Sequence, residues 1–288
     1  MVQSDFVLQE HEEMNLKSSQ KDFKFPLIMG ILNVTPDSFS DGGIYFTKEK
    51  AVERAMEMFE QGADIIDIGG ESTRPGSEPV SLEEEVRRVI PVIKEILLQK
   101  PDSLLSIDTT KSAVAREACK AGVKIINDIS GLTFDPEILN IAKKFSASLV
   151  IMHIRGTPRD MQVNPFYENV ISEIYEFLGG QIKKAIEAGV EDIIIDPGIG
   201  FGKRVEDNFE ILKNLSEFKK LGYPVLIGLS RKSFLGKILD LEVNERDTAT
   251  SIAETIAMIN GASIIRTHNV SNAVKARKLL TYSYSVNV

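Results

Sequence analysis

The sequence predicts an α/β protein, a single (β/α)8 barrel of the TIM type over residues 25–288, preceded by a short polar N-terminal extension, residues 1–24. Eight short apolar runs alternate with longer amphipathic stretches, which is the pattern of parallel strands joined by helices. No linker rich in Pro, Gly or Ser divides the chain. A length of 288 residues suits eight strand–helix units in one barrel.

Each predicted strand is a run of apolar, often β-branched residues. Runs that are apolar at nearly every position are typical of strands buried on both faces of a parallel sheet. The predicted strands are residues 27–32, 65–68, 104–107, 124–126, 149–152, 193–195, 225–227 and 263–265.

The stretches between the strands carry apolar residues at helical spacing. Several of them end at a glycine, the residue that most readily takes the left-handed conformation that stops a helix. The predicted helices are residues 48–61, 81–99, 111–121, 136–145, 168–188, 205–221, 248–260 and 271–280.

Composition excludes several classes of protein. A net charge of −8 and a pI near 5.2 argue against a nucleic-acid partner, which would require a basic surface. No apolar run is long enough for a membrane helix, and residues 1–24 lack the apolar core of a signal peptide. Cys119 is the single cysteine. We therefore expect no internal disulfide, a buried Cys119 on a helix, and a cytoplasmic location.

Polar side chains follow almost every predicted strand. In a barrel of this type the carboxyl ends of the strands form one face, which carries the active site. Turn formation accounts for some of these polar residues, such as Ser130, Thr133 and Asp135, but not for all eight strand ends together. The residues at the ends are Asn33, Gly69-Gly70-Glu71, Asp108, Asn127-Asp128, His153, Asp196, Ser230-Arg231-Lys232, Arg266 and His268.

The first group of strand-end residues suits a flat heterocycle. Asp108, Asn127 and Asp196 offer acceptors and one amide to a ring that carries an amino group and N–H donors, and a carboxylate facing two parallel N–H groups makes a strong bidentate contact. Lys232 can donate a hydrogen bond to such a ring. Arg266 can stack on it, because guanidinium is planar.

A second group carries cations or amides. Asn33, Arg74 and His268, with Arg231 as a further candidate, suit a phosphate or diphosphate. An Asn carbonyl oxygen combined with phosphate oxygens suits Mg²⁺, so Asn33 is the candidate metal ligand.

Two loops have the composition of functional segments. Residues 35–43 combine carboxylates, Phe39 and hinge glycines after the first strand, as in a lid. Gly198, Gly200 and Gly202 follow Asp196 at a spacing that differs from the dinucleotide fingerprint. We expect these glycines to let the backbone approach a ligand while Phe201 supplies an aromatic wall.

Taken together, these segments resemble the dihydropteroate synthase family over almost all of residues 25–278. The motifs that carry the resemblance are residues 29–43 (Met-Gly-Ile-Leu-Asn-Val-Thr-Pro-Asp-Ser-Phe-Ser-Asp-Gly-Gly), residues 67–76 (Asp-Ile-Gly-Gly-Glu-Ser-Thr-Arg-Pro-Gly), Ser106-Ile-Asp-Thr, Ile126-Asn-Asp-Ile, Met152-His-Ile-Arg-Gly-Thr-Pro, Asp196-Pro-Gly-Ile-Gly-Phe-Gly-Lys, Ser230-Arg-Lys-Ser-Phe and Arg266-Thr-His.

The resemblance implies a transferase of folate biosynthesis that condenses 6-hydroxymethyl-7,8-dihydropterin diphosphate with 4-aminobenzoate and releases diphosphate, with Mg²⁺ as cofactor. It implies a homodimer as well. By motif, Asp108, Asn127, Asp196 and Lys232 would hold the pterin, and Arg266 would stack on it. Diphosphate and Mg²⁺ would bind at Asn33, Arg74 and His268. The residues implied around 4-aminobenzoate are Phe39, Asp41, Thr73, Pro75, Phe201 and Ser230.

The resemblance also implies where the chemistry takes place. Arg74, His268 and Mg²⁺ would stabilise the departing diphosphate, and Asp41 would stabilise the developing pterin cation when its loop closes. The ring delocalises positive charge, so we expect a dissociative path without a covalent enzyme intermediate. Together with Lys232, these residues form the predicted catalytic set.

The chain departs from the family pattern at two positions. Ile199 stands where the family often has Phe, which would loosen the aminobenzoate wall. Asn269 follows His268 where Asp is usual, which changes the surroundings of that histidine.

Three alternatives stay open at this point. A pterin-binding barrel of the methyltetrahydrofolate type would share the pterin acceptors, but would not need Arg74 or the Asn33 loop. An aldolase-like enzyme would use Lys232 as a Schiff-base nucleophile, which borohydride trapping would reveal. A purely structural role is disfavoured by the polar strand ends.

Overall fold

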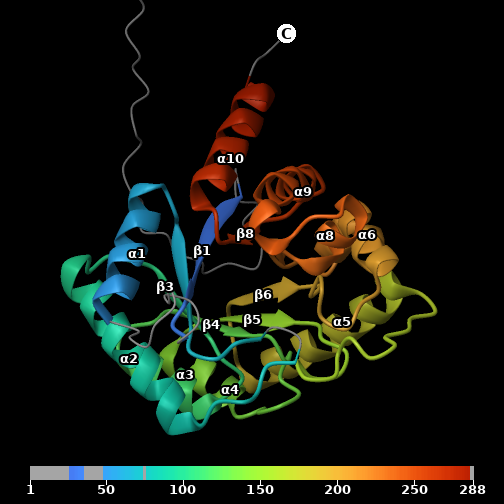
Figure 1. Ribbon diagram of the computed structural model, residues 1–288. Helices are drawn as coiled ribbons and strands as arrows, with labels where there is room; N and C mark the ends of the chain where they lie inside the picture. Colours follow the sequence, from blue (N-terminus) through green and yellow to red (C-terminus); the bar gives the residue numbers. More distant parts are fainter. Residues whose placement is uncertain (1–25, 36–47, 74–75, 286–288) are drawn as a thin grey trace, which may run out of the picture.

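The structure is a computed structural model that describes residues 26–35, 48–73 and 76–285. In these residues eight strands and ten α-helices alternate along the chain (Figure 1). The strands are β1 (Leu27–Asn33), β2 (Ile65–Gly69), β3 (Leu105–Asp108), β4 (Ile125–Asp128), β5 (Ser148–Met152), β6 (Ile193–Asp196), β7 (Leu226–Gly228) and β8 (Ile264–Thr267). The helices are α1 (Lys48–Glu60), α2 (Leu82–Gln99), α3 (Ser112–Lys120), α4 (Ile138–Phe145), α5 (Val170–Ala188), α6 (Val205–Lys213), α7 (Leu215–Lys219), α8 (Ser233–Leu239), α9 (Asp247–Ile259) and α10 (Val270–Ser285).

The strands form one parallel sheet that curls into a nearly closed barrel, which confirms the predicted fold. Their order is β6-β5-β4-β3-β2-β1-β8-β7. The remaining seam, between β6 and β7, is joined by a single bridge from Ile195 to Val225. There the Ile195 N–H donates to the Pro224 carbonyl at 3.0 Å, whereas Pro224 itself has no N–H to return.

Side chains that point into the barrel form two layers, because alternate residues of a strand face opposite sides. The lower layer is an apolar cluster to which seven strands contribute: Leu27, Met29, Ile65, Ile125, Val150, Ile194, Leu226 and Ile264. One step further toward the carboxyl ends, the same strands place Asp67, Asn127, Asp196 and Arg266. The barrel is therefore closed by an apolar floor beneath a polar layer.

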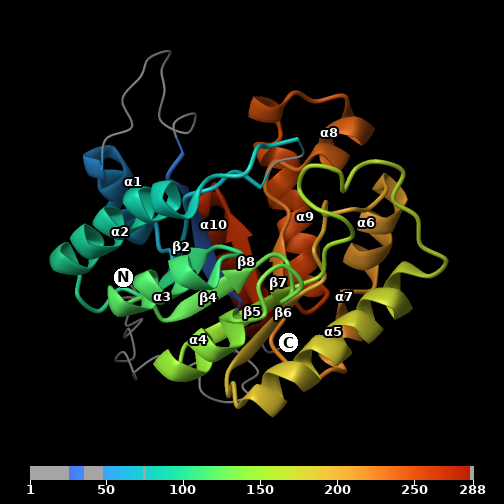
Figure 2. The same cartoon turned by 90° about the horizontal axis from the view of Figure 1, so that it is seen from below.

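The residues facing outward from the strands pack under the surrounding helices. Ile66, Ile68, Ile107 and Ile195 belong to this second, larger core. Figure 2 shows the helices arranged around the central strands. This shell fixes the strands, and the strands in turn fix the residues at their carboxyl ends.

The predicted helices differ from the observed ones at three places. Residues 205–221 form two helices, α6 and α7, because Asn214 leaves the helical conformation, with φ −106° and ψ 27°, while its side chain binds the Glu210 carbonyl at 2.9 Å. Helix α8 is short and contains Gly236, so the spacing of its apolar residues did not predict a helix there. Helix α10 extends to Ser285, past the predicted end at residue 280.

Other expectations concern the rest of the chain. Cys119 is buried in α3, as predicted, and burial raises the pKa of its thiol to about 12. No helix in the described part of the chain is both long and apolar enough to cross a membrane. The predicted extension, residues 1–24, lies outside the described residues.

Candidate active site

Asp67, Asn127 and Arg266 of the polar layer form one hydrogen-bonded group with Asp108 of β3. The Arg266 guanidinium donates to Asp67 Oδ2 at 2.6 Å and to Asp108 Oδ2 at 2.7 Å. Asn127 Nδ2 donates to the same Asp67 oxygen at 2.8 Å. Neighbouring registers explain the grouping: Asp108 pairs with Asn127, while Ile31 of β1 pairs with Asp67 and Met29 of β1 pairs with Arg266.

Two atoms in this layer are buried without a hydrogen-bond partner among the described residues, namely Asp67 Oδ1 and Ser106 Oγ. Asp67 and Ser106 are register partners on β2 and β3. Buried polar atoms are costly when unsatisfied, so a native protein rarely leaves two side by side without a function. The layer therefore has hydrogen-bonding capacity that the described residues do not use.

Burial controls the charge state of the two strand-end carboxyl groups. It raises the pKa of Asp108 to about 7, although Arg266 opposes the shift. Burial also raises the pKa of Asp196, and the N–H of Gly198 opposes that change. Groups with such shifted pKa values are common in binding and catalytic sites.

The loop after β6 folds back on Asp196. Asp196 Oδ1 accepts the Gly198 N–H at 2.7 Å. Gly198 has a φ of +70°, and a Cβ at this position would lie 1.9 Å from the His153 carbonyl oxygen. Only glycine fits here, because it has no Cβ. The backbone that Gly198 approaches is that of the loop after β5, and the predicted approach of these glycines to a ligand stays a prediction.

Lys232 lies against this loop. Its ammonium group donates to the Ile199 carbonyl and lies 4.3 Å from the centre of the Phe201 ring. Burial lowers the pKa of Lys232 to about 8, while nearby Asp196 opposes the shift. The structure thus brings Lys232, Phe201 and Asp196 together, as the sequence predicts. The Ile199 side chain is buried in the outer core.

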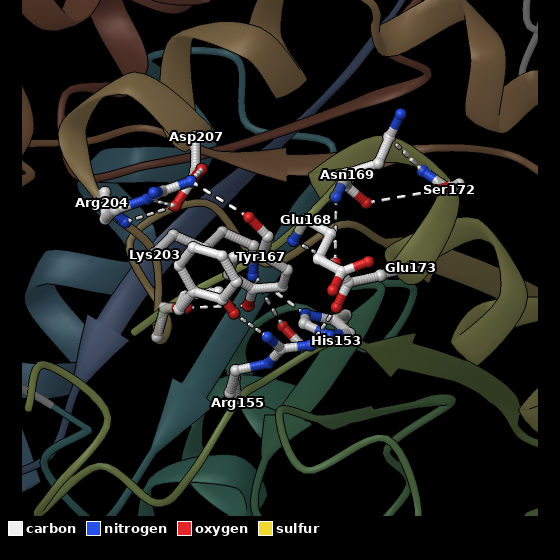
Figure 3. Close-up of polar contacts among 12 residues, drawn as sticks. His153, Arg155, Tyr167, Glu168, Asn169, Ser172, Glu173, Lys203, Arg204 and Asp207 are labelled. Atoms are coloured by element: carbon white, nitrogen blue, oxygen red, sulfur yellow. Dashed lines mark hydrogen bonds and ion pairs between the residues drawn. The ribbon is translucent and has the colours of Figure 1, made fainter. Parts of the chain in front are cut away.

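His153 does not face the polar layer but holds the loops that follow β5 and β6. Figure 3 shows it beside Lys203, whose Nζ lies 3.0 Å from His153 Nδ1. Lys203 also donates to the carbonyl of Phe201 at 3.0 Å, and Tyr167 Oη donates to the carbonyl of Gly202 at 2.8 Å. Burial and the nearby Lys203 lower the pKa of His153 to about 2. A histidine this buried and neutral ties the loops after β5 and β6 together.

The strand ends of β7 and β8 meet at Ser230 and His268. Ser230 Oγ accepts the His268 backbone N–H at 3.1 Å and lies 2.9 Å from His268 Nδ1. Arg231 turns away from this contact, because its guanidinium binds both oxygens of Asp247, at 2.6 and 3.0 Å. This ion pair disfavours the suggestion that Arg231 is a phosphate ligand.

The remaining described site residues lie at the rim. Asn33 ends β1, and its Oδ1 would be 3.8 Å from a Cβ built on Gly69. Thr73 and Asp108 line a cavity of about 300 Å³ between the loops after β2, β3, β4 and β5. A second cavity of about 480 Å³ is bordered by Gly200 and by Ser233, the residue after Lys232. The first cavity reaches Asp108, whereas none of the residues of the polar layer lines the second.

The fold and this geometry agree with the comparisons to known proteins. Residues 29–268 match the family model described as pterin binding enzyme. The chain is 46% identical to the dihydropteroate synthase of Haemophilus influenzae over 262 residues, which cover 90% of this chain and 94% of that protein. The chain belongs to the dihydropteroate synthase family.

Solved structures of this family have the same architecture. The Xanthomonas albilineans dihydropteroate synthase with 4-aminobenzoic acid superposes with a TM-score of 0.86 at 42% identity, covering 91% of this chain and 94% of that one. The same bacterial enzyme in complex with 7,8-dihydropteroate gives a TM-score of 0.82 at 39% identity, with 91% and 95% covered. Like its relatives in the dihydropteroate synthase family, the chain is a transferase.

Four residues predicted for the dihydropteroate synthase site lie outside the described residues: Phe39, Asp41, Arg74 and Pro75. Their roles stay predictions. The other predicted site residues lie at the carboxyl ends of the strands or in the loops that follow.

Two residues of the site were missed by the sequence reasoning. Asp67 lies inside β2 instead of after it, so a search of strand ends overlooked it. Its signal was a charged residue within an apolar strand, which requires a partner when buried. Asp247 begins α9, and no local pattern connected it with Arg231, which lies in the loop after β7.

Proposed function

We propose that this dihydropteroate synthase condenses 6-hydroxymethyl-7,8-dihydropterin diphosphate with 4-aminobenzoate, by departure of diphosphate before the amine attacks. Asp108, together with Asn127 and Asp196 of the polar layer above the apolar floor, carries the proposal. It offers acceptors for the amino and N–H groups of a pterin at a depth where water is excluded. Relatives whose structures contain 4-aminobenzoic acid or 7,8-dihydropteroate support the choice of substrates.

Arg266 suits the pterin ring in this proposal. Hydrogen bonds to a guanidinium lie in its plane, so the contacts with Asp67 and Asp108 leave its faces available for stacking. Lys232, close to Asp196, would donate to the ring from the side of Phe201. A positive charge held in a buried site interacts strongly with the ring system, because the local dielectric is low.

The diphosphate would bind near His268, with Arg74 as its second cationic partner. Ser230 fixes the orientation of the His268 ring through Nδ1. Fixed donors stabilise charge that develops on a leaving group without reorganising during the reaction. Asp41 would stabilise the opposite charge on the pterin carbon.

Magnesium suits the same end of the site. No cluster of three or more His, Cys, Asp or Glu side chains able to hold a metal occurs among the described residues. A magnesium ion would therefore need the Asn33 carbonyl oxygen together with phosphate oxygens and water, which is a ligand set that Mg²⁺ accepts. When bound, it would supply positive charge that favours diphosphate departure.

A homodimer is the proposed assembly. Ile252, Ile256 and Ile259 are exposed on one face of α9, and α9 packs against α10 (Figure 1), which exposes Leu279 and Tyr282. Exposed apolar residues gathered on two adjacent helices favour a second copy as their partner. Ile256→Glu should shift the sedimentation mass from dimer to monomer, whereas the control Leu98→Glu, on α2, should not. A monomeric wild type would refute the dimer.

Two assays test the reaction. Product formation from both substrates, with and without Mg²⁺, tests the overall chemistry and the cofactor. Positional isotope exchange in the pterin diphosphate, with Mg²⁺ and a non-nucleophilic benzoate analogue, tests the order of steps. Exchange in wild type and its reduction in Asp41→Asn are expected. Absent exchange in wild type would indicate concerted displacement, and unchanged exchange in Asp41→Asn would remove Asp41 from the mechanism.

A further inference from the structure

Asp247 lies outside the residues so far assigned to the reaction, but it connects two of the strand ends that form the site. It is the first residue of α9. Its Oδ1 accepts from Arg231 Nε at 2.6 Å. Its Oδ2 accepts from Arg231 Nη2 at 3.0 Å and from Asn269 Nδ2 at 3.1 Å. One carboxylate thus holds a residue after β7 and a residue after β8.

The two residues that Asp247 holds directly follow Ser230 and His268. Ser230 and His268 contact each other through a backbone N–H and through Nδ1, at 3.1 and 2.9 Å. Each partner in this contact therefore has a chain neighbour attached to the same carboxylate. A shift of Asp247 would displace both sides of the contact.

Arg231 requires such a restraint. Its φ is +56°, in the left-handed region that non-glycine residues avoid. Three contacts hold this turn: its N–H donates to Thr250 Oγ1 at 3.0 Å, its carbonyl accepts from Arg246 at 3.2 Å, and its guanidinium is bound bidentately by Asp247. Bidentate Arg–carboxylate pairs fix orientation as well as position.

Asn269 connects Asp247 to the start of α10. Its amide donates to Asp247 Oδ2 at 3.1 Å. Asn269 also caps α10, because its Oδ1 accepts the N–H of Asn272 at 3.2 Å.

We propose that Asp247 is a positioning residue for the diphosphate end of the site, where it holds Arg231 and Asn269 and thereby the Ser230–His268 contact. This inference rests on the proposed role of His268 as a diphosphate ligand.

The test exchanges the amide and the carboxylate between the two positions. Asp247→Asn should raise the KM for the pterin diphosphate, and the inhibition constant of added inorganic diphosphate, about tenfold, because a charge-assisted pair is lost. The KM for 4-aminobenzoate should not change. In Asp247→Asn combined with Asn269→Asp, the amide and the carboxylate face each other in reverse, but Arg231 still lacks its bidentate partner, so both constants should recover only in part.

Controls separate the possible failures. Asp240→Asn, at the exposed C-terminus of α8, should leave all constants unchanged. If His268→Ala weakens diphosphate inhibition but Asp247→Asn does not, the role of Asp247 is overturned and the proposed function stands. If His268→Ala does not change diphosphate inhibition, both the role of Asp247 and the proposed role of His268 are overturned. A lower melting temperature without a change in KM, or a lack of rescue in the double variant, would reduce Asp247 to a structural role.

A second variant is needed if Asp247→Asn does not fold. Asp247→Glu keeps the charge but displaces the carboxylate, and should raise the same constants severalfold. Unchanged constants in Asp247→Glu would overturn the proposal.

Discussion

Arg266 and Asp108 form an ion pair of 2.7 Å between β8 and β3 at the carboxyl end of the barrel. Asp67 holds the same guanidinium at 2.6 Å and connects it to Asn127. Because both carboxyl groups are buried, removing one partner would leave an uncompensated charge, which costs about 3–5 kcal/mol. The polar layer is therefore fixed before a ligand arrives, and this preorganisation shapes the predictions below.

Replacement of Asp196 by Asn should weaken pterin binding. The amide oxygen of the new residue can still accept the Gly198 N–H that Asp196 accepts at 2.7 Å, so the loop should keep its fold. Its amide nitrogen would then face a ligand N–H in place of an acceptor. Loss of a charged hydrogen bond costs about 1.5–3 kcal/mol, or roughly tenfold to a few hundredfold in affinity. Calorimetry with the pterin measures this, and unchanged affinity would remove Asp196 from the site.

The activity of the enzyme should fall at alkaline pH because Lys232 loses its proton. Its pKa is lowered to about 8 by burial, so it is protonated below that pH and loses its charge as the pH rises through it. The kcat/KM for the pterin diphosphate should fall over the same range. Lys232→Arg should be poorly active, since a planar fork cannot replace a compact ammonium, and its pH profile should lack this fall. Wild-type activity of Lys232→Arg would mean that Lys232 does not contact the pterin.

Glu254 should make the stability of the protein depend on pH. It is buried in α9, its Oε1 has no partner among the described residues, and burial raises its pKa to about 8 against the opposing hydrogen bond of Thr267. The folded state therefore binds the proton more tightly than the unfolded chain, so the stabilising effect is full below about pH 4.5 and is lost as the pH rises through 8.

Glu254→Gln should remove this dependence. At pH 9 the variant should be more stable than wild type by roughly 1–3 kcal/mol, and at pH 4 the difference should vanish. Thermal melting at both values measures it. Glu191→Gln, at an exposed position, is the control and should follow wild type. Equal melting temperatures of Glu254→Gln and wild type at pH 9 would contradict the prediction.

Two glycine substitutions separate loop geometry from backbone strain. Gly198 and Gly222 both have positive φ, +70° and +86°. Gly222→Ala meets no atom within 4 Å and should cost only the backbone strain, about 1 kcal/mol. Gly198→Ala would press on the His153 carbonyl, so the loop that carries Phe201 must move. We expect a larger loss of stability and a loss of activity for Gly198→Ala alone; equal effects of the two changes would contradict this.

Most of the fold was predictable because barrel strands are short, apolar and regularly spaced. The break at Asn214 was not, since it depends on a side chain that competes for a helix carbonyl. Strand ends such as Asp108 and Asp196 were found from topology alone. Asp67 and Asp247 were missed, because their importance comes from partners 199 and 16 residues away along the chain. The charge inside the apolar run of β2 indicates that Asp67 needs a partner, but the local sequence does not say which residue across the barrel that partner is.

The seam between β6 and β7 has a mechanical consequence. Seven of the eight strand–strand contacts of the barrel are continuous ladders, and the eighth, between β6 and β7, is one bridge. We therefore expect the barrel to open at this seam before it deforms elsewhere. The two edges of the seam carry the loop with Asp196 and Phe201 and the loop with Ser230 and Lys232. A ligand that touches both loops would bridge the seam, so the energy of binding it would also tighten the barrel.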